Sequence, residues 1–217
     1  MKKTNYVVIV IFFLISVESL SQNLSLNKLY KIARKAPDSI KADKFEIVDY
    51  FKTKTENPKE LVLLFVYWIT QNISYDVEKS HISYFSIISA WETLEKRKTI
   101  CGGYAELLSE LCYWADIECE IIRGYTKGID YNGKPIEDPN HVWNAVLINN
   151  KWELIDVTWA SGFVSVKNKS LVFNKLYNYK YVFAKPEYLI KTHFPIDSRW
   201  QLLDRPISIN TFYIEFN

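Results

Sequence analysis

The 217-residue sequence is poor in glycine, cysteine and methionine, with six Gly, three Cys and one Met. So little glycine excludes a collagen-like chain or a flexible linker, and so few cysteines exclude a disulfide-stapled scaffold. The formal net charge of +2 lacks the excess of Lys and Arg that marks nucleic-acid-binding proteins. The sequence is instead rich in aromatic residues, with seven Trp, 15 Tyr and 12 Phe. This composition excludes a disordered chain and is typical of a globular domain.

The N-terminus has the pattern of a signal peptide, which we place at residues 1–21. Two lysines precede an apolar run from Tyr6 to Val17, and Ser19 and Ser21 are small residues suited to cleavage. The run is shorter than the roughly 20 residues that span a bilayer; an uncleaved N-terminal anchor is the alternative. We therefore expect an exported protein, periplasmic or extracellular, in an oxidising compartment and without stable membrane insertion after cleavage.

Hydrophobic periodicity predicts an α+β fold for the rest of the chain. Residues 22–58 are expected to form an N-terminal helical extension, and residues 59–217 one domain with a C-terminal tail. Helices are predicted over residues 27–36, 58–71, 86–96 and 101–114, the third with Ile87, Ile88, Trp91 and Leu94 facing inward. Strands are predicted over residues 117–125, 141–148 and 151–158, with one more between 163 and 173. Because helices precede strands, we expect helices packed on a mostly antiparallel sheet.

Cys101 lies at the predicted start of a helix and is followed by Gly102 and Gly103. Glycine inside a helix costs roughly 1 kcal/mol relative to alanine, and such violations of local propensity tend to mark functional positions. A helix start favours a thiolate, and the absent Cβ atoms would let a substrate approach the backbone. We interpret Cys101 as a candidate nucleophile with a backbone oxyanion donor. A buried helical cysteine beside a tight turn explains the segment equally well.

His141 and Asp156 are predicted to lie on one face of a hairpin. Asn149 and Asn150 suit a two-residue turn, and this turn fixes the register of the two strands. The two side chains then become diagonal neighbours, with Cβ atoms about 7 Å apart. Such a pair lets the carboxylate fix the tautomer of the imidazole. The alternatives are a structural histidine and an aspartate that bonds backbone amides beside Thr158.

The remaining histidines and cysteines are not predicted to join this site. His81 and His193 have no patterned acid at a useful spacing. No His pair occurs at helical spacing and the cysteines are unevenly spaced, so we predict no metal site and no cofactor. Cys112 and Cys119 can pair across the turn between helix and strand, which would leave Cys101 as the free thiol; otherwise all three are free.

The motifs around these residues resemble the transglutaminase-like superfamily of papain-related cysteine enzymes. The resemblance rests on a Cys-Gly-Gly-Tyr-Ala helix start, a His-Val-Trp-Asn strand and a Trp-Glu-Leu-Ile-Asp-Val-Thr-Trp strand. Upstream, Trp68-Ile69 and the run from Asn72 to Asp76 also fit. Downstream, the tail resembles the branch that includes kyphoscoliosis peptidase, through Pro186-Glu187, His193-Phe194-Pro195 and Trp200-Gln201-Leu202-Leu203. The similarity covers roughly residues 37–205 and departs at Thr99-Ile100, where the family commonly has Gly-Val.

This resemblance implies a papain/transglutaminase-like core and a catalytic triad that maps onto Cys101, His141 and Asp156. Cys101 would attack an amide carbonyl, His141 would transfer the proton and Asp156 would orient His141. The expected substrate is a protein or peptide, with cell-envelope peptide as one option, and hydrolysis is favoured over transfer to an amine. The alternative is a non-catalytic scaffold that binds protein or cell-envelope glycan.

Overall fold

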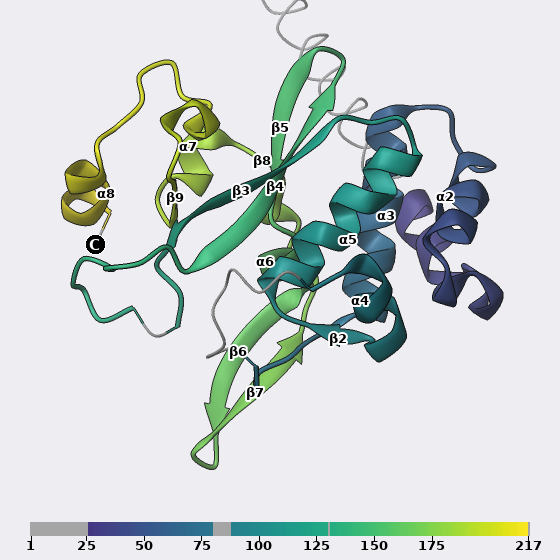
Figure 1. Ribbon diagram of the computed structural model, residues 1–217, viewed down its shortest axis with the longest axis horizontal. Helices are drawn as coiled ribbons and strands as arrows, with labels where there is room; N and C mark the ends of the chain where they lie inside the picture. Colours follow the sequence, from purple (N-terminus) through teal and green to yellow (C-terminus); the bar gives the residue numbers. More distant parts are fainter. Residues whose placement is uncertain (1–25, 80–87, 130, 217) are drawn as a thin grey trace, which may run out of the picture.

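The computed structural model describes residues 26–79, 88–129 and 131–216 (Figure 1). The predicted signal peptide, His81 and Ile87 lie outside these described residues. Within the described ranges, no helix combines the length and the hydrophobicity needed to cross a bilayer.

The N-terminal half is helical, as predicted. Asn57 Oδ1 accepts hydrogen bonds from the N–H groups of Lys59 and Glu60, and Pro58 occupies the first turn, so the long central helix begins where the sequence indicates. This helix is buried without interruption from residue 61 to residue 70. The helical elements are a segment over residues 26–34, then η1 (Asp38–Ala42), α2 (Lys44–Lys52), α3 (Pro58–Asn72), α4 (Ala90–Lys96) and α5 (Cys101–Trp114).

Helix α4 starts later than the sequence predicts, and one residue predicted to face inward is exposed. Ser89 Oγ accepts a hydrogen bond from the Glu92 N–H and so caps the helix. Leu94 is buried as predicted, but Trp91 is 67% exposed, so its predicted inward orientation is wrong. Because Ala90 and Leu94 define the buried face of this short helix, the residue directly after Ala90 points to solvent.

The second half forms a five-stranded sheet in the order β8-β5-β4-β3-β9, with antiparallel neighbours throughout. Asn149 and Asn150 form the turn between β4 and β5 with φ angles of 50° and 61°, and Ile148 pairs with Lys151. The predicted two-residue turn and its register are therefore confirmed. The strands are β3 (Cys119–Thr126), β4 (His141–Ile148), β5 (Lys151–Ile155), β8 (Val182–Ala184) and β9 (His193–Pro195).

Two of the predicted strands are wrong in detail. The strand predicted over residues 151–158 ends at Ile155, because Asp156 instead caps helix α6 (Val157–Ser161). The single strand predicted between residues 163 and 173 is a hairpin of β6 (Gly162–Lys167) and β7 (Ser170–Lys175). Asn168 and Lys169 turn the chain there, both at positive φ.

Helices α2, α3 and α5 lie on one side of the sheet and α7 (Pro186–Leu189) on the other, and α8 (Ile209–Glu215) packs against Phe194 of β9 (Figure 1). The main core joins α2, α3 and α5 to the sheet through Val146 and Ile148 of β4. Two short strands, β1 (Ser74–Tyr75) and β2 (Lys98–Thr99), pair in parallel directly before α5 and fix where that helix begins. The architecture is the predicted α+β arrangement of helices on an antiparallel sheet, with Cys101 at a helix N-terminus.

Candidate active site

Cys101 is the first residue of α5, and no side chain caps this helix start. Ile100 before it is extended, with φ −99° and ψ −177°, and its carbonyl accepts hydrogen bonds from the Gly103 and Tyr104 N–H groups. The thiol therefore lies at the positive end of a 14-residue helix dipole, where negative charge is stabilised.

Gly103 is required by packing rather than by substrate access. A Cβ atom at this position would overlap Thr99 Oγ1 and press on Thr93 Oγ1. These two hydroxyls lie 3.3 Å apart and hydrogen-bond to each other between β2 and α4. The expectation that Gly103 keeps the backbone open for a substrate is therefore wrong, because its missing side chain is used to bring the start of α5 close to its neighbours.

His141 opens β4 and brings the three residues predicted from the sequence together. Its Nε2 lies 2.8 Å from Asp156 Oδ2, and the Cys101 side chain is a further hydrogen-bonding neighbour of the same ring. Burial opposes the charged imidazolium, but Asp156 and then Cys101 outweigh it and raise the pKa of His141 to about 10. With Nε2 directed at the carboxylate, Nδ1 is the nitrogen left for the thiol.

Asp156 is fully buried, and both of its carboxylate oxygens are used. Oδ1 accepts a hydrogen bond from the Trp159 N–H at 3.0 Å, and Oδ2 faces His141. Burial favours the neutral acid, but His141 and then His193 hold the pKa of this carboxyl well below its usual range. Both roles that the sequence suggested for Asp156 are present together, since it pairs with a histidine and also bonds a backbone amide.

His193 is part of this site, so the prediction that it stays outside is wrong. Its Nε2 lies 2.9 Å from Asp156 Oδ2, and its Nδ1 lies 2.8 Å from Thr192 Oγ1. Burial and the charge of His141 outweigh the attraction of Asp156 and lower the pKa of His193. The one signal for it in the sequence is the His-Phe-Pro motif, which supported the family resemblance but indicated no role.

His141, Asp156 and His193 also form the one group among residues 26–79, 88–129 and 131–216 that could hold a metal ion. One ligand atom from each lies within 4.8 Å of the others. Because both Nε2 atoms point at the same carboxylate oxygen, an ion would have to replace both hydrogen bonds. The sequence pattern does not indicate this cluster, since its members come from three separate segments.

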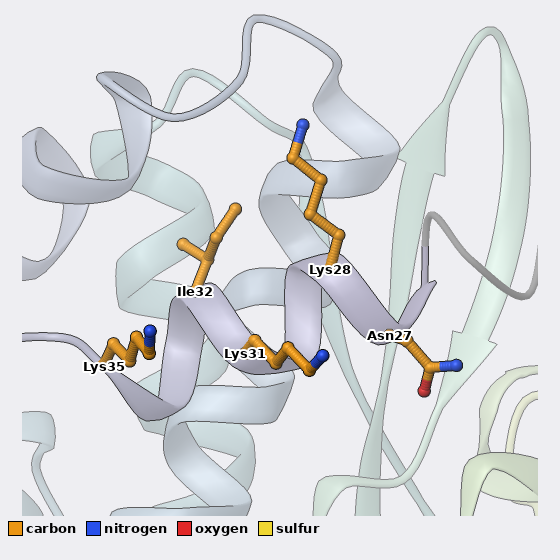
Figure 2. A pocket seen from close by; sticks show the side chains of 5 residues that line it. All are labelled: Asn27, Lys28, Lys31, Ile32 and Lys35. Carbon is orange, nitrogen blue, oxygen red and sulfur yellow. The ribbon is translucent and has the colours of Figure 1, made fainter.

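A hollow elsewhere on the surface is separate from the candidate site. It follows one face of the helical segment over residues 26–34, and none of its lining residues belongs to the site around Cys101 (Figure 2). Its lining is three lysines, one amide and one apolar residue: Lys28, Lys31, Lys35, Asn27 and Ile32.

The candidate site is closed to solvent. The exposed fraction is 1% for Cys101, 6% for His141, 0% for Asp156 and 1% for His193. Cys101 packs against Ala105 of its own helix and against Ile121 and Val142 of the sheet. A substrate can therefore reach the thiol only after local movement of the groups that cover it.

The sequence matches a known family over the part of the chain that carries Cys101, His141 and Asp156. The family model of the transglutaminase-like superfamily matches residues 46–157. Mouse kyphoscoliosis peptidase is 34% identical over 176 residues, which are 80% of this chain and 26% of that protein. Hillarin of Drosophila melanogaster is 31% identical over 123 residues, which are 51% of this chain and 15% of that protein.

This chain matches only part of the length of these relatives. The chain spans about a quarter of the length of the mouse and human kyphoscoliosis peptidases. A crystal structure of a TGase superposes with a TM-score of 0.43 at 18% identity, over 67% of this chain and 38% of that one.

Proposed function

Because this chain belongs to the transglutaminase-like superfamily, in the branch that includes kyphoscoliosis peptidase, we propose that it is a thiol enzyme that acts on amide bonds. The observation that carries this proposal is the buried His141–Asp156 pair at 2.8 Å, with Cys101 as a further side chain that interacts with the imidazole. A nucleophile, a base and a group that orients the base are the parts that acyl transfer needs.

The proposed reaction uses only the side chains of this chain. The Cys101 thiol gives its proton to His141 and its sulfur attacks the amide carbon. The negative charge that develops on oxygen is stabilised by the backbone N–H at the start of α5. His141 then gives a proton to the departing amine, which leaves an acyl thioester on Cys101. Water attacks the thioester with His141 as base, and the acid leaves as the thiol is restored. Asp156 keeps the imidazole oriented through both steps.

We propose hydrolysis of protein or peptide substrates as the overall reaction, with cell-envelope peptides as one substrate class. Transfer to an amine would follow the same first half, with an amine instead of water attacking the thioester. The two outcomes are separated by offering a glutamine-containing peptide with and without a labelled primary amine and measuring ammonia release and label incorporation.

The thiol chemistry is tested by alkylation of the purified protein with iodoacetamide at pH 6, with the modified residue located by peptide mapping. Cys101 should react at least about tenfold faster than a cysteine in an unstructured peptide, since an imidazolium partner favours the reactive thiolate. His141→Ala should remove this advantage. A Cys101 that reacts no faster than the peptide cysteine, with or without His141, would reject the enzyme proposal.

The second candidate function is a binding module built on the same scaffold, and it is favoured by the burial of Cys101. Because the exposed fraction of this residue is 1%, a large substrate can meet the thiol only after the groups that cover it move. A bulky maleimide separates the two candidates when its rate is compared with that of iodoacetamide. An enzyme should admit both reagents to Cys101 in the native state, whereas a closed scaffold should admit the bulky one only in denaturant.

We also propose that the protein acts outside the cytoplasm, on the basis of the N-terminal pattern alone. The amino acids from Lys2 to Val17 support a signal peptide, and Ser19 and Ser21 are the suggested cleavage sites. Mass spectrometry of the protein recovered from its native cells should find an N-terminus at Leu20 or Gln22. Recovery of the intact N-terminus in the cytosolic fraction would contradict export.

A further inference from the structure

We propose that His193 is a positioning residue of this site, which acts through Asp156 to hold the carboxylate ionised and correctly placed for His141. The inference deepens the proposed thiol chemistry and rests on it. The observation behind it is a continuous hydrogen-bonded chain of buried groups, in which the Asp156 Oδ2 atom lies 2.8 Å from His141 Nε2 and 2.9 Å from His193 Nε2.

The hydrogen bonds of His193 define the state in which it can do this. Its Nε2 faces a carboxylate oxygen, which is an acceptor, so Nε2 must carry the proton. Its Nδ1 lies 2.8 Å from Thr192 Oγ1, whose hydroxyl can donate to an unprotonated nitrogen. A neutral imidazole with its proton on Nε2 satisfies both contacts, and its buried position beside the charged His141 favours that neutral form.

The surroundings of His193 hold its ring in one place. The Trp159 ring centroid lies 4.6 Å away and the Trp143 centroid 5.2 Å away, both nearly edge-to-face, and the Tyr181 centroid lies at 6.0 Å. Such packing leaves the imidazole little rotational freedom, so its N–H is directed at the carboxylate before any substrate arrives.

The backbone fixes the position of His193 as firmly as the rings do. His193 pairs with Thr126 of β3, and the Lys127 N–H donates to the Thr192 carbonyl at 3.0 Å. Gly124 allows this close approach, because a Cβ atom there would strike the Phe194 carbonyl oxygen and the Trp143 ring. The second histidine is therefore carried by the sheet that also carries His141.

The titratable groups around His193 show which charge its N–H can affect. The titratable groups near it are Asp156, His141 and Tyr181, and beyond Asp156 lies the buried phenol of Tyr104. Asp156 is the one acid among these that is ionised near neutral pH, and it has no contact with solvent. Each N–H donated to a buried carboxylate favours its ionised form and takes up part of its negative charge. Removal of the His193 donor should therefore leave Asp156 more basic, so that Asp156 holds the proton of His141 more tightly.

The test compares two substitutions at one position. His193→Gln can keep an N–H donor directed at Asp156, whereas His193→Phe keeps an aromatic ring but has no donor. The chain has three histidines, so their imidazole NMR signals can be assigned from His81→Gln and His141→Gln spectra. In the purified full chain, His193→Phe should raise the pKa of His141 by about one unit, which is about tenfold in its protonation equilibrium. His193→Gln should restore most of that change, and thermal unfolding should show that both variants are folded.

Alkylation of Cys101 by iodoacetamide from pH 5 to pH 8 separates this inference from the proposed function. If both are right, the pH midpoint of alkylation falls in His193→Phe and returns towards the wild-type value in His193→Gln. If the His141 pKa depends on His193 while wild-type Cys101 reacts like a peptide thiol, the positioning role stands and the enzyme proposal fails.

Two results would overturn the positioning role. One is a His141 titration that is identical in the wild type, His193→Gln and His193→Phe. The other is a zinc ion that purifies with the wild type at one equivalent and is lost in His193→Phe, because the cluster would then serve as a metal site.

Discussion

The stability of a Cys101→Ser variant should fall as the pH rises from 6.5 to 8.5, because His141 is protonated in the folded state and not in the unfolded state, and no thiolate at position 101 offsets that proton. Its pKa is raised from 6.5 to about 10 on folding. A raised pKa contributes stability that is complete below the unfolded value and is lost as the pH rises towards the folded one. Over this window the folded chain holds up to one proton more than the unfolded chain, so the free energy of unfolding should decrease by about 2 kcal/mol.

The pH window is chosen so that His141 is the group whose protonation changes. Asp156 has a lowered pKa, so its contribution is present above the unfolded value near 4 and is lost only in acid. The pKa of His193 is lowered as well, so its effect falls below pH 6.5 and has the opposite sign to that of His141. Above pH 9 the raised pKa of Cys112 would add a further loss, which is why the measurement stops at 8.5.

The measurement is urea unfolding followed by tryptophan fluorescence at intervals of half a pH unit, under reducing conditions. The slope of the unfolding free energy against pH should be negative in Cys101→Ser and close to zero when His141→Gln is added to that variant. A Cys101→Ser stability that is constant or rises across the window would refute the assignment of a buried imidazolium. An equal slope in the double variant would show that another group titrates.

Three further predictions concern the surroundings of the site. Asp156→Asn should slow alkylation of Cys101 at pH 6 by about 100-fold, because an amide cannot stabilise the imidazolium of His141. The control is Asp76→Asn at another buried carboxylate, whose alkylation rate should stay within about threefold of the wild-type rate. Cys112 and Cys119 have side chains that interact with each other and are free in the structure. Oxidised glutathione should therefore join them in a disulfide, with a mass loss of about two hydrogens and about 2 kcal/mol of added stability. A stable glutathione adduct on Cys119 alone would argue against their proximity. Gly103→Ala should cost about 2 kcal/mol in urea unfolding through its overlap with Thr99 Oγ1, and a Thr99→Ala background should reduce that cost, whereas strict additivity would indicate that the two positions do not touch.

The elements that the sequence predicts well are those set by neighbours in the chain. Helix α3 follows from Asn57 and Pro58, and the β4–β5 register follows from the turn at Asn149 and Asn150. In each case a few adjacent residues determine the local backbone, so no knowledge of the tertiary fold is needed. The meeting of His141 with Asp156 follows from the same turn, since the hairpin alone brings the two residues near each other.

The errors arise where a polar residue ends one element and starts another. Ser89 starts α4 late and turns Trp91 outward, and Asp156 ends β5 early and starts α6. Apolar periodicity continues through both places, so it predicts a longer helix and a longer strand than the caps allow. At Asp156 the consequence is functional, because the cap holds Oδ1 on the Trp159 N–H and leaves Oδ2 for the two histidines.

His193 could not be placed in the site from the sequence, because its contact depends on the order of strands in the sheet. The strand that it opens lies beside β3, whereas Asp156 follows β5, and β4 and β3 separate the two strands. The residues meet because β4 and β9 begin, and β3 and β5 end, at the same end of the sheet: Gly124 pairs with both His141 and Pro195, and Thr126 pairs with His193. Local patterns specify each strand but not this shared end. A histidine that looks isolated in the sequence thus becomes the second donor to the one buried carboxylate that the proposed chemistry requires.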